Sequence, residues 1–323
     1  MKLTDLKKKT ADKQAEELRR MLTEAYKAVP AGKREELDRV LFPEENAEDR
    51  TEKVIQQAEY FVECVDENLY FRPNRVVPAK ERSNWRFTAG KLIRELTAVK
   101  AEDPLYQEAS LALAKIYGAL LSGHVWHKFA SDRPFDSLRI DRKQLLYTIA
   151  ERLLSGNVTK ECFLLLLDQL AKNFVWENHL LYILSKCVEG REAKLATAAW
   201  ASERMKGKPV AKGWDVITDP RKGYLVYCVF AYAQAGEMEK AYTLYMNDPA
   251  ESDKGKTAKY QGLMQIVVFS MDREDMQNAY EAFLRLGKKQ KLKVSERTHG
   301  DYLERAGLLS GEETEGLTFP DTP

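Results

Sequence analysis

Residues 224–246 read YLVYCVFAYAQAGEMEKAYTLYM, and residues 260–284 read YQGLMQIVVFSMDREDMQNAYEAFL. Each segment combines a first helical stretch of about 14 residues, a tight turn and a second helical stretch. The pairs Ala241-Tyr242 and Ala279-Tyr280 lie 38 residues apart. Because a single helical hairpin cannot bury its own apolar face, a repeated hairpin predicts an array of stacked helix pairs.

The two segments resemble the helical-hairpin repeats called tetratricopeptide and pentatricopeptide repeats. Gly236 lies where these families place a turn glycine, and Ala241 lies where they place a small residue for close helix contact. The second segment departs from the pattern, since Glu274 aligns with Gly236 and the spacing exceeds the roughly 34 residues of a tetratricopeptide repeat. The resemblance implies a superhelix whose groove binds peptides or single-stranded RNA. Two ordinary antiparallel helix pairs that share Ala-Tyr are the alternative.

The composition of the whole chain also favours helices. There are only 17 Gly and 11 Pro among 323 residues, below the combined share of roughly 12% that is typical. Apolar residues make up 44% of the chain, which is enough for a substantial core. We therefore predict an all-α fold, an α-solenoid of antiparallel helix pairs of the TPR/PPR-like or HEAT-like kind, forming a right-handed superhelix with an N-terminal helical extension.

Breaks in the helical pattern predict four parts of the chain. These are an N-terminal helical segment (1–70), helices with two long polar loops (71–140), a helical-repeat domain (141–309) and an acidic flexible tail (310–323). Ser83 or Asn84 is the expected N-cap after the first loop, and the second loop is expected over 123–140. Beyond residue 141 we expect helices at 141–155, 159–174, 177–188, 191–206, 222–235, 237–248, 255–271, 273–287 and 295–308.

Several function classes lack their sequence signals. No apolar run reaches the roughly 18 residues of a membrane-spanning helix, so we expect no membrane partner. The four cysteines are scattered, which favours a reducing, cytoplasmic location. The sequence contains no P-loop, GxGxxG, GxSxG or HExxH motif, and we expect no cofactor and no catalytic or metal-ligating residue. The pair His124 and His127 has helical spacing but lacks the further ligands that zinc needs.

Local charge departs strongly from the formal net charge of +1. Residues 34–67 contain twelve acidic and four basic groups, whereas residues 68–100 contain eight basic and two acidic groups. We expect the basic stretch to pair with the acidic helix before it. The alternative is nucleic-acid binding, because Arg side chains interleaved with aromatic residues hold phosphates and stack on bases.

Two further polar segments are candidates. Residues 285–297 contain six basic groups and one acidic group, and residues 132–142, DRPFDSLRIDR, alternate acid and Arg. The first is expected to be a solvated loop, and the second either a polar pocket or a loop held by its own ion pairs. The candidate partner- or phosphate-binding residues are Arg72, Arg75, Arg82, Trp85, Arg86, Arg94, Arg133, Arg139 and Arg142.

The functional hypothesis from sequence is a non-catalytic helical-repeat scaffold or adaptor that binds a protein or peptide partner. One alternative is an RNA- or DNA-binding helical array that uses the basic segments 72–100 and 285–297. Another is a helical enzyme or accessory subunit with a polar site in 124–142.

Overall fold

The computed structural model of the chain describes residues 10–11, 13–30, 33–34, 37–38, 41, 47–71, 78–129, 131, 133–156, 158–172, 178–206, 219–249 and 255–308. These ranges contain helices and no strand, which confirms the all-α prediction. No helix within them is long and apolar enough to cross a membrane. The expected acidic tail, 310–323, lies outside the described residues.

The helices vary from single-turn to five-turn elements. They are α2 (Ala15–Ala28), α4 (Ala47–Asp66), α5 (Ala79–Thr97), α6 (Tyr106–Val125), α7 (Pro134–Leu138), α8 (Arg142–Leu154), α9 (Lys160–Lys172), α10 (Asn178–Cys187), α11 (Arg191–Met205), α13 (Pro220–Gln234), α14 (Met238–Met246), α15 (Lys256–Ser270), α16 (Arg273–Lys289) and α17 (Glu296–Ala306).

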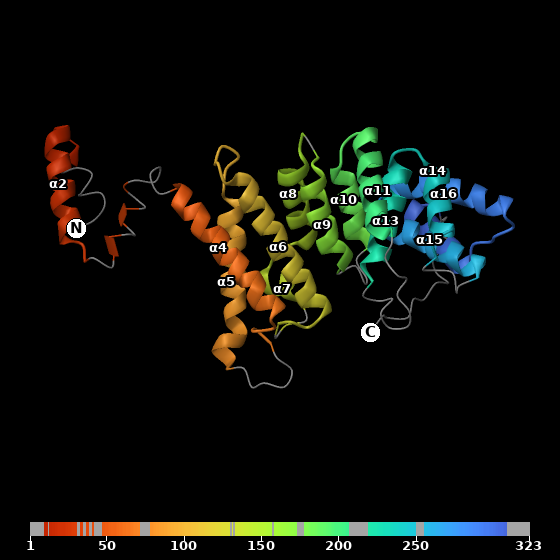
Figure 1. The fold of residues 1–323 in the computed structure, drawn as a ribbon, viewed down its shortest axis with the longest axis horizontal. Coiled ribbons are helices and arrows are strands. Elements are labelled where there is room, and N and C mark those ends of the chain that lie inside the picture. The colour runs from red at the N-terminus through yellow and green to blue at the C-terminus, as the bar shows by residue number, and fades with distance from the viewer. Residues whose placement is uncertain are drawn as a thin grey trace.

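From α4 onward the helices follow one another along the long axis of the molecule in sequence order (Figure 1). Helix α13 is central to the packing, since it contacts α9, α10, α11 and α14. Every residue from Gly223 to Ala233 in this helix is buried. A helix that is apolar on every side must lie inside the protein, as this one does. The right-handed superhelix remains a prediction.

The buried apolar side chains form one cluster, which extends from Val54 in α4 to Ala306 in α17. Helix α4 packs on α5 and α6, and α6 packs in turn on α8 and α9. The core is therefore continuous across residues 70 and 140. The division of the chain into four parts stays a prediction.

All the helices expected beyond residue 141 are present, and their ends lie within two residues of the predicted ones. Several of them start after a residue whose side chain accepts a hydrogen bond from a backbone N–H of the first turn, whereas α11, α14 and α15 have no such cap. The residues that cap helices in this way are Asp141, Asp219, Asp272 and Ser295.

Two expectations for residues 71–140 need correction. Helix α5 begins at Ala79, directly after Pro78, and not at Ser83 or Asn84. Ala79 and the residues that follow it are good helix formers, and no Gly or Pro interrupts them before Gly90. The second loop is also shorter than expected, because α6 continues to Val125 and Pro134 begins the short helix α7.

The hairpin turn that suggested a repeat has the expected local geometry. Gly236 adopts a φ of 79°, in the left-handed region that favours glycine. The N–H of Glu237 donates to the carbonyl of Tyr232 across this turn. Ala241 and Ala279, the small residues shared by the two segments, are both fully buried. Close helix contact at these positions therefore excludes larger side chains.

Helix α2 is the described part of the N-terminal extension. It buries none of its residues, and Figure 1 shows it apart from the other helices. Its apolar side chains Leu18, Met21 and Leu22 are each exposed. Helix α2 therefore exposes apolar side chains, although its Tyr26 hydroxyl donates to Asp38 (3.1 Å).

A polar network joins α10, α11, α13 and α16. The carboxylate of Asp275 accepts hydrogen bonds from the Tyr182 hydroxyl (2.8 Å) and from Gln234 Nε2 (3.2 Å), and Lys186 Nζ lies 3.4 Å away. The side-chain amide oxygen of Gln234, Oε1, in turn accepts a hydrogen bond from Lys194 Nζ (2.9 Å). Because its members are hydrogen-bonded to one another, the network satisfies polar groups that would be costly to bury singly.

The close approach of α13 to α9 generates a stability prediction. A Cβ atom at Gly223 would lie 2.8 Å from the Cα atom of Ala171. Gly223→Ala is therefore expected to lower the free energy of unfolding by about 1–3 kcal/mol, measured by chemical denaturation. Gly300→Ala is the control, because no atom lies within 4 Å of its added Cβ. The control is expected to change stability by less than about 1 kcal/mol, in the stabilising direction. Equal stability of the two variants would contradict the close approach.

Candidate functional site

Helix α5 has one buried face and one exposed, cationic face. Trp85, expected to contact a partner, is only 1% exposed and stacks on Phe129 with ring centroids 4.2 Å apart. Its ring is therefore inaccessible to a nucleic-acid base. The neighbouring residues Arg86 and Phe87 point outward, and Phe87 is 74% exposed. Lys91, one turn further on, and Arg94, two turns further on, continue the exposed face.

The arginines of this face make no ion pair with the described side chains of the acidic helix before them. Among the described residues, Arg86 and Arg94 have no side-chain hydrogen-bond or ion-pair partner. Described acidic residues of α4 pair elsewhere, as in Glu59 with Lys115 of α6 (2.9 Å). The described residues therefore give no support to intramolecular pairing at these two arginines. Pairing with the other acidic residues of 34–67, such as Glu48 and Asp49, stays a prediction, because their side chains lie outside the described part of the chain.

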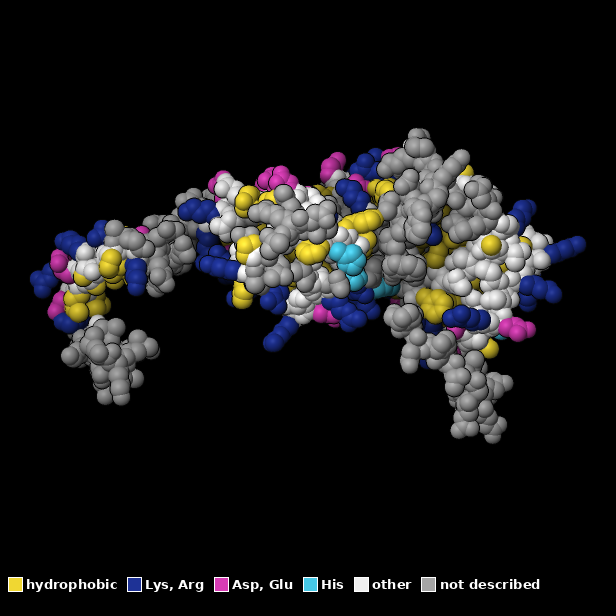
Figure 2. Space-filling model, turned by 90° about the horizontal axis from the view of Figure 1, so that it is seen from below, with side chains coloured by type: hydrophobic (Ala, Val, Ile, Leu, Met, Phe, Trp, Pro, Cys, Tyr) yellow, Lys and Arg dark blue, Asp and Glu magenta, His cyan; other side chains and the backbone are white. Residues whose placement is uncertain are grey.

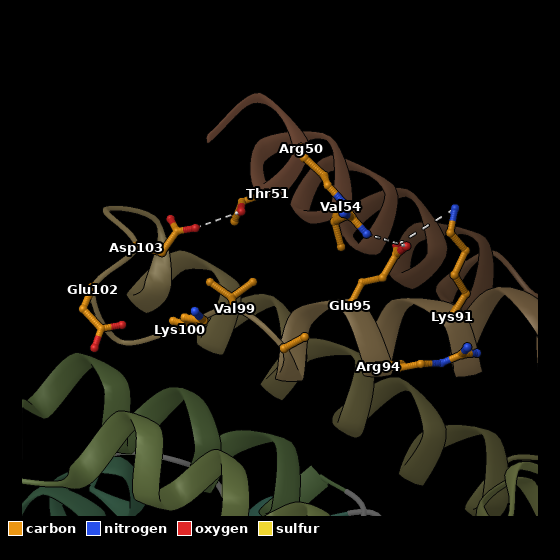
Figure 3. A pocket seen from close by; sticks show the side chains of 11 residues that line it. Arg50, Thr51, Val54, Lys91, Arg94, Glu95, Val99, Lys100, Glu102 and Asp103 are labelled. Atoms are coloured by element: carbon orange, nitrogen blue, oxygen red, sulfur yellow. Dashed lines mark hydrogen bonds and ion pairs between the residues drawn. The ribbon is translucent and has the colours of Figure 1, made fainter. Parts of the chain in front are cut away.

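The ion pair that α4 and α5 form within the described residues joins a base of the acidic helix to an acid of the basic helix, the reverse of the pairing expected. Arg50 of the acidic helix lies 3.8 Å from Glu95 of the basic helix, and Lys91 approaches the other oxygen of Glu95 at 4.0 Å. Figure 3 shows these three side chains together, with Arg94 pointing away from them. Near the start of α4, the Thr51 hydroxyl donates to Asp103 (3.1 Å).

A groove of about 690 Å³ lies between α4, the end of α5 and the turn that follows it. Its apolar wall is formed by Val54, Ala98 and Val99. Cations and carboxylates alternate around this wall, so the groove offers partners for both signs of charge. The charged lining residues are Arg50, Lys91, Arg94, Lys100, Glu95, Glu102 and Asp103.

Arg152 of α8 binds the backbone at the end of α5, next to the groove. It was not among the candidate residues from the sequence. Its guanidinium donates to the carbonyls of Leu96 (3.0 Å), Thr97 (3.1 Å) and Val99 (3.3 Å), at the end of α5. Its Nε also donates to the Ser110 hydroxyl (2.9 Å). Carbonyls at the end of a helix lack intrahelical donors, and this arginine supplies them.

The second polar segment forms a separate cavity of about 520 Å³ where α6 ends and α8 begins. Arg133 and Arg142 line it, whereas Arg139 is exposed on the same loop with a φ of 56°. His124 also lines this cavity, but His127 does not. Within the described residues no group of three or more His, Cys, Asp or Glu side chains is arranged to hold a metal ion.

The two basic segments lie far apart. Helix α5 is at one end of the helical body, and α16, which carries much of 285–297, is at the other (Figure 1). Figure 2 shows Lys and Arg side chains gathered at both of these ends. They therefore do not form one continuous basic surface. Arg72 and Arg75 lie outside the described residues, and of Arg82 only the backbone, in α5, is described.

The thiols and phenols inside the body are poorly suited to nucleophilic chemistry. Burial raises the pKa of the Cys187 thiol to about 11, so this group is protonated at neutral pH. The pKa of the fully buried Cys228 thiol is also raised by burial. The tyrosines of the first hairpin are buried in the core, namely Tyr224, Tyr227, Tyr232, Tyr242 and Tyr245.

His179, in the first turn of α10, has a strongly lowered pKa. Burial lowers this pKa to about 4, with further contributions from the positive charges of Arg142 and Lys143. Helices α8 and α10 pack together, which brings these residues near one another. The imidazole is therefore neutral at pH 7 and lies in a positive electrostatic field.

Arg152→Lys tests the hydrogen bonds between the Arg152 guanidinium and the carbonyls at the end of α5. A lysine has a single ammonium and cannot reproduce the planar set of donors that contacts three carbonyls and Ser110. We expect the free energy of unfolding to fall by about 1–3 kcal/mol in chemical denaturation. Arg191→Lys is the control, because this exposed arginine donates to one carbonyl, that of Ala235, and pairs with Glu237. Equal losses in the two variants would argue against a special role for Arg152.

His179 generates a prediction of pH dependence. Between its ordinary pKa of 6.5 and its folded value of about 4, the unfolded chain binds a proton that the folded chain does not. Lowering the pH from about 7 to about 5 is therefore expected to favour unfolding. The pH-dependent loss of stability, measured by denaturant titration, is expected to be smaller in His179→Gln. Parallel pH curves for the two proteins would contradict the lowered pKa.

Comparison of the chain with protein-family models, with curated proteins and with solved structures finds no match. The resemblance to helical-hairpin repeats therefore depends on this chain's own residues, chiefly Gly236, Ala241 and Ala279.

Proposed function

We propose that the protein is a helical scaffold that binds a peptide segment of a protein partner, and that the groove between α4 and α5 is its binding site. The observation that carries this proposal is the combination of an apolar wall with lining charges of both signs. A volume of about 690 Å³ is within the range of roughly 300–1,000 Å³ typical of ligand sites.

The chemistry of the groove favours a peptide over a phosphate backbone. Three lining carboxylates, Glu95, Glu102 and Asp103, would repel a polyanion at short range. A peptide offers apolar, acidic and basic side chains in one segment, and these complement Val54, Arg94 and Glu102 respectively. Arg94 is available for such a contact because it makes no ion pair within the described residues.

The exposed face of α5 extends this site beyond the groove. Phe87 and Arg94 lie two turns apart on one side of the same helix, so one acidic segment with an apolar residue can contact both. Buried aromatic and arginine contacts commonly supply much of the energy of protein interfaces. We expect Phe87 and Arg94 to make the largest contributions.

A selection of displayed random peptides tests this function. Selected peptides are expected to combine acidic and apolar residues, and their affinity is expected to fall at least about tenfold on Arg94→Glu, measured by calorimetry. The control is Arg285→Glu, which makes the same change of charge at an exposed position at the other end of the body. The proposal fails if no peptide is selected, or if both variants bind the selected peptides equally.

A second candidate function, single-stranded nucleic-acid binding, is favoured by one observation. Phe87 is widely exposed beside Arg86, which has no partner among the described residues. Stacking on an exposed ring next to a cation is a common way to hold unpaired bases. Titration with labelled single-stranded RNA distinguishes this function. Its affinity would fall steeply with salt and on Phe87→Ala, whereas the peptide proposal predicts no saturable RNA binding.

A further inference from the structure

A second cavity, of about 520 Å³, lies on the surface where the end of α6, the helix α7 and the start of α8 meet. Side chains with nitrogen donors reach it from each of these elements. They are His124 from α6, Arg133 before α7, and Arg142 and Lys143 from α8. The two arginines and the lysine carry the positive charge. Figure 2 shows histidine side chains beside a group of Lys and Arg in the middle part of the molecule.

The two carboxylates that line the cavity already have partners. Asp141 accepts hydrogen bonds from the N–H groups of Lys143 (2.8 Å) and Gln144 (3.1 Å), and these bonds lower its pKa. Asp136 lies 3.9 Å from Arg133. The backbone donors at the start of α8 are thus occupied by Asp141. Any anion in the cavity must therefore be held by cationic side chains and not by the helix terminus.

The region around α8 is also electrostatically positive deeper in the fold. His179 of α10 is held neutral partly by the charges of Arg142 and Lys143, as described above. This effect shows that the two cations influence their surroundings despite the adjacent Asp141. An anion placed between them would lower the local potential and make protonation of His179 more favourable.

We propose that this cavity binds the phosphate group of a small soluble molecule. Arginine suits this role, because its planar guanidinium donates two parallel hydrogen bonds to phosphate oxygens. Arg133 and Arg142 supply two such groups, and Lys143 adds a point charge. Pro134, Phe135 and Ile140 form an apolar wall for the organic part of the ligand. The site is separate from the peptide groove and does not depend on it.

Pyrophosphate is the first probe, used with the full chain at low ionic strength. We expect saturable binding by calorimetry, and we expect the pKa of His179, followed through its ring protons by nuclear magnetic resonance, to rise on saturation. Arg142→Gln is expected to weaken binding at least about tenfold. The matched control is Arg139→Gln, an exposed arginine of the same loop that does not line the cavity, with an expected change within about twofold.

Several results would overturn the proposal. The site is excluded if pyrophosphate neither binds to the unsubstituted protein nor shifts the pKa of its His179. This measurement does not depend on the folding of a variant. Equal weakening by Arg142→Gln and Arg139→Gln would indicate nonspecific attraction. Vesicles containing phosphatidic acid form the second arm of the experiment. If they bind while pyrophosphate does not, the cavity recognises a lipid headgroup and the inference of a soluble ligand is wrong.

Discussion

The burial of every residue from Gly223 to Ala233 in α13 is the constraint on which the remaining structure depends. A helix with apolar residues on every side needs neighbours on every side, and α9, α10, α11 and α14 provide them. The absence of a side chain at Gly223 permits the close contact with α9. Since α9 also packs on α6, this arrangement extends the core toward α4 and α5. The groove of the proposed peptide site thus lies where α4, the end of α5 and the turn after it meet beside this core.

The positions of the helices were predictable from the sequence, whereas most contacts between helices were not. Helix ends beyond residue 141 were predictable because capping residues such as Asp272 act locally. The candidate Trp85 is buried on the side of α5 that faces the core. The sequence alone did not indicate this side, because it depends on packing partners that are remote in sequence. The groove was not predictable for the same reason, since Arg50 and Asp103 line one groove only because α4 packs on α5 and α6. Arg152 gave no local signal, because its acceptors are carbonyls more than fifty residues away.

The local charge composition identified the acidic and the basic segments but did not predict which of their residues form ion pairs. The contrast between residues 34–67 and 68–100 suggested that the two segments neutralise each other. Among the described residues, Arg50 pairs with Glu95 while Arg94 remains exposed. Exposed arginines without an ion-pair partner in the described part of the chain, Arg86 and Arg94, thus occur although the formal net charge is +1. Local surface charge follows from register and packing as much as from composition.

The network around Asp275 restricts how the helices can slide along one another. Apolar helix surfaces tolerate shifts of one turn, about 5.4 Å, because one leucine or valine can replace another in a contact. Such a shift of α16 would move the Asp275 carboxylate away from Tyr182 and Gln234. The Tyr182 hydroxyl and the Gln234 amide would then lose their acceptor, and the carboxylate would lose its donors. The network therefore discriminates against misregistered packing. Its main contribution is to the uniqueness of the folded state, in a protein whose helices share similar apolar surfaces.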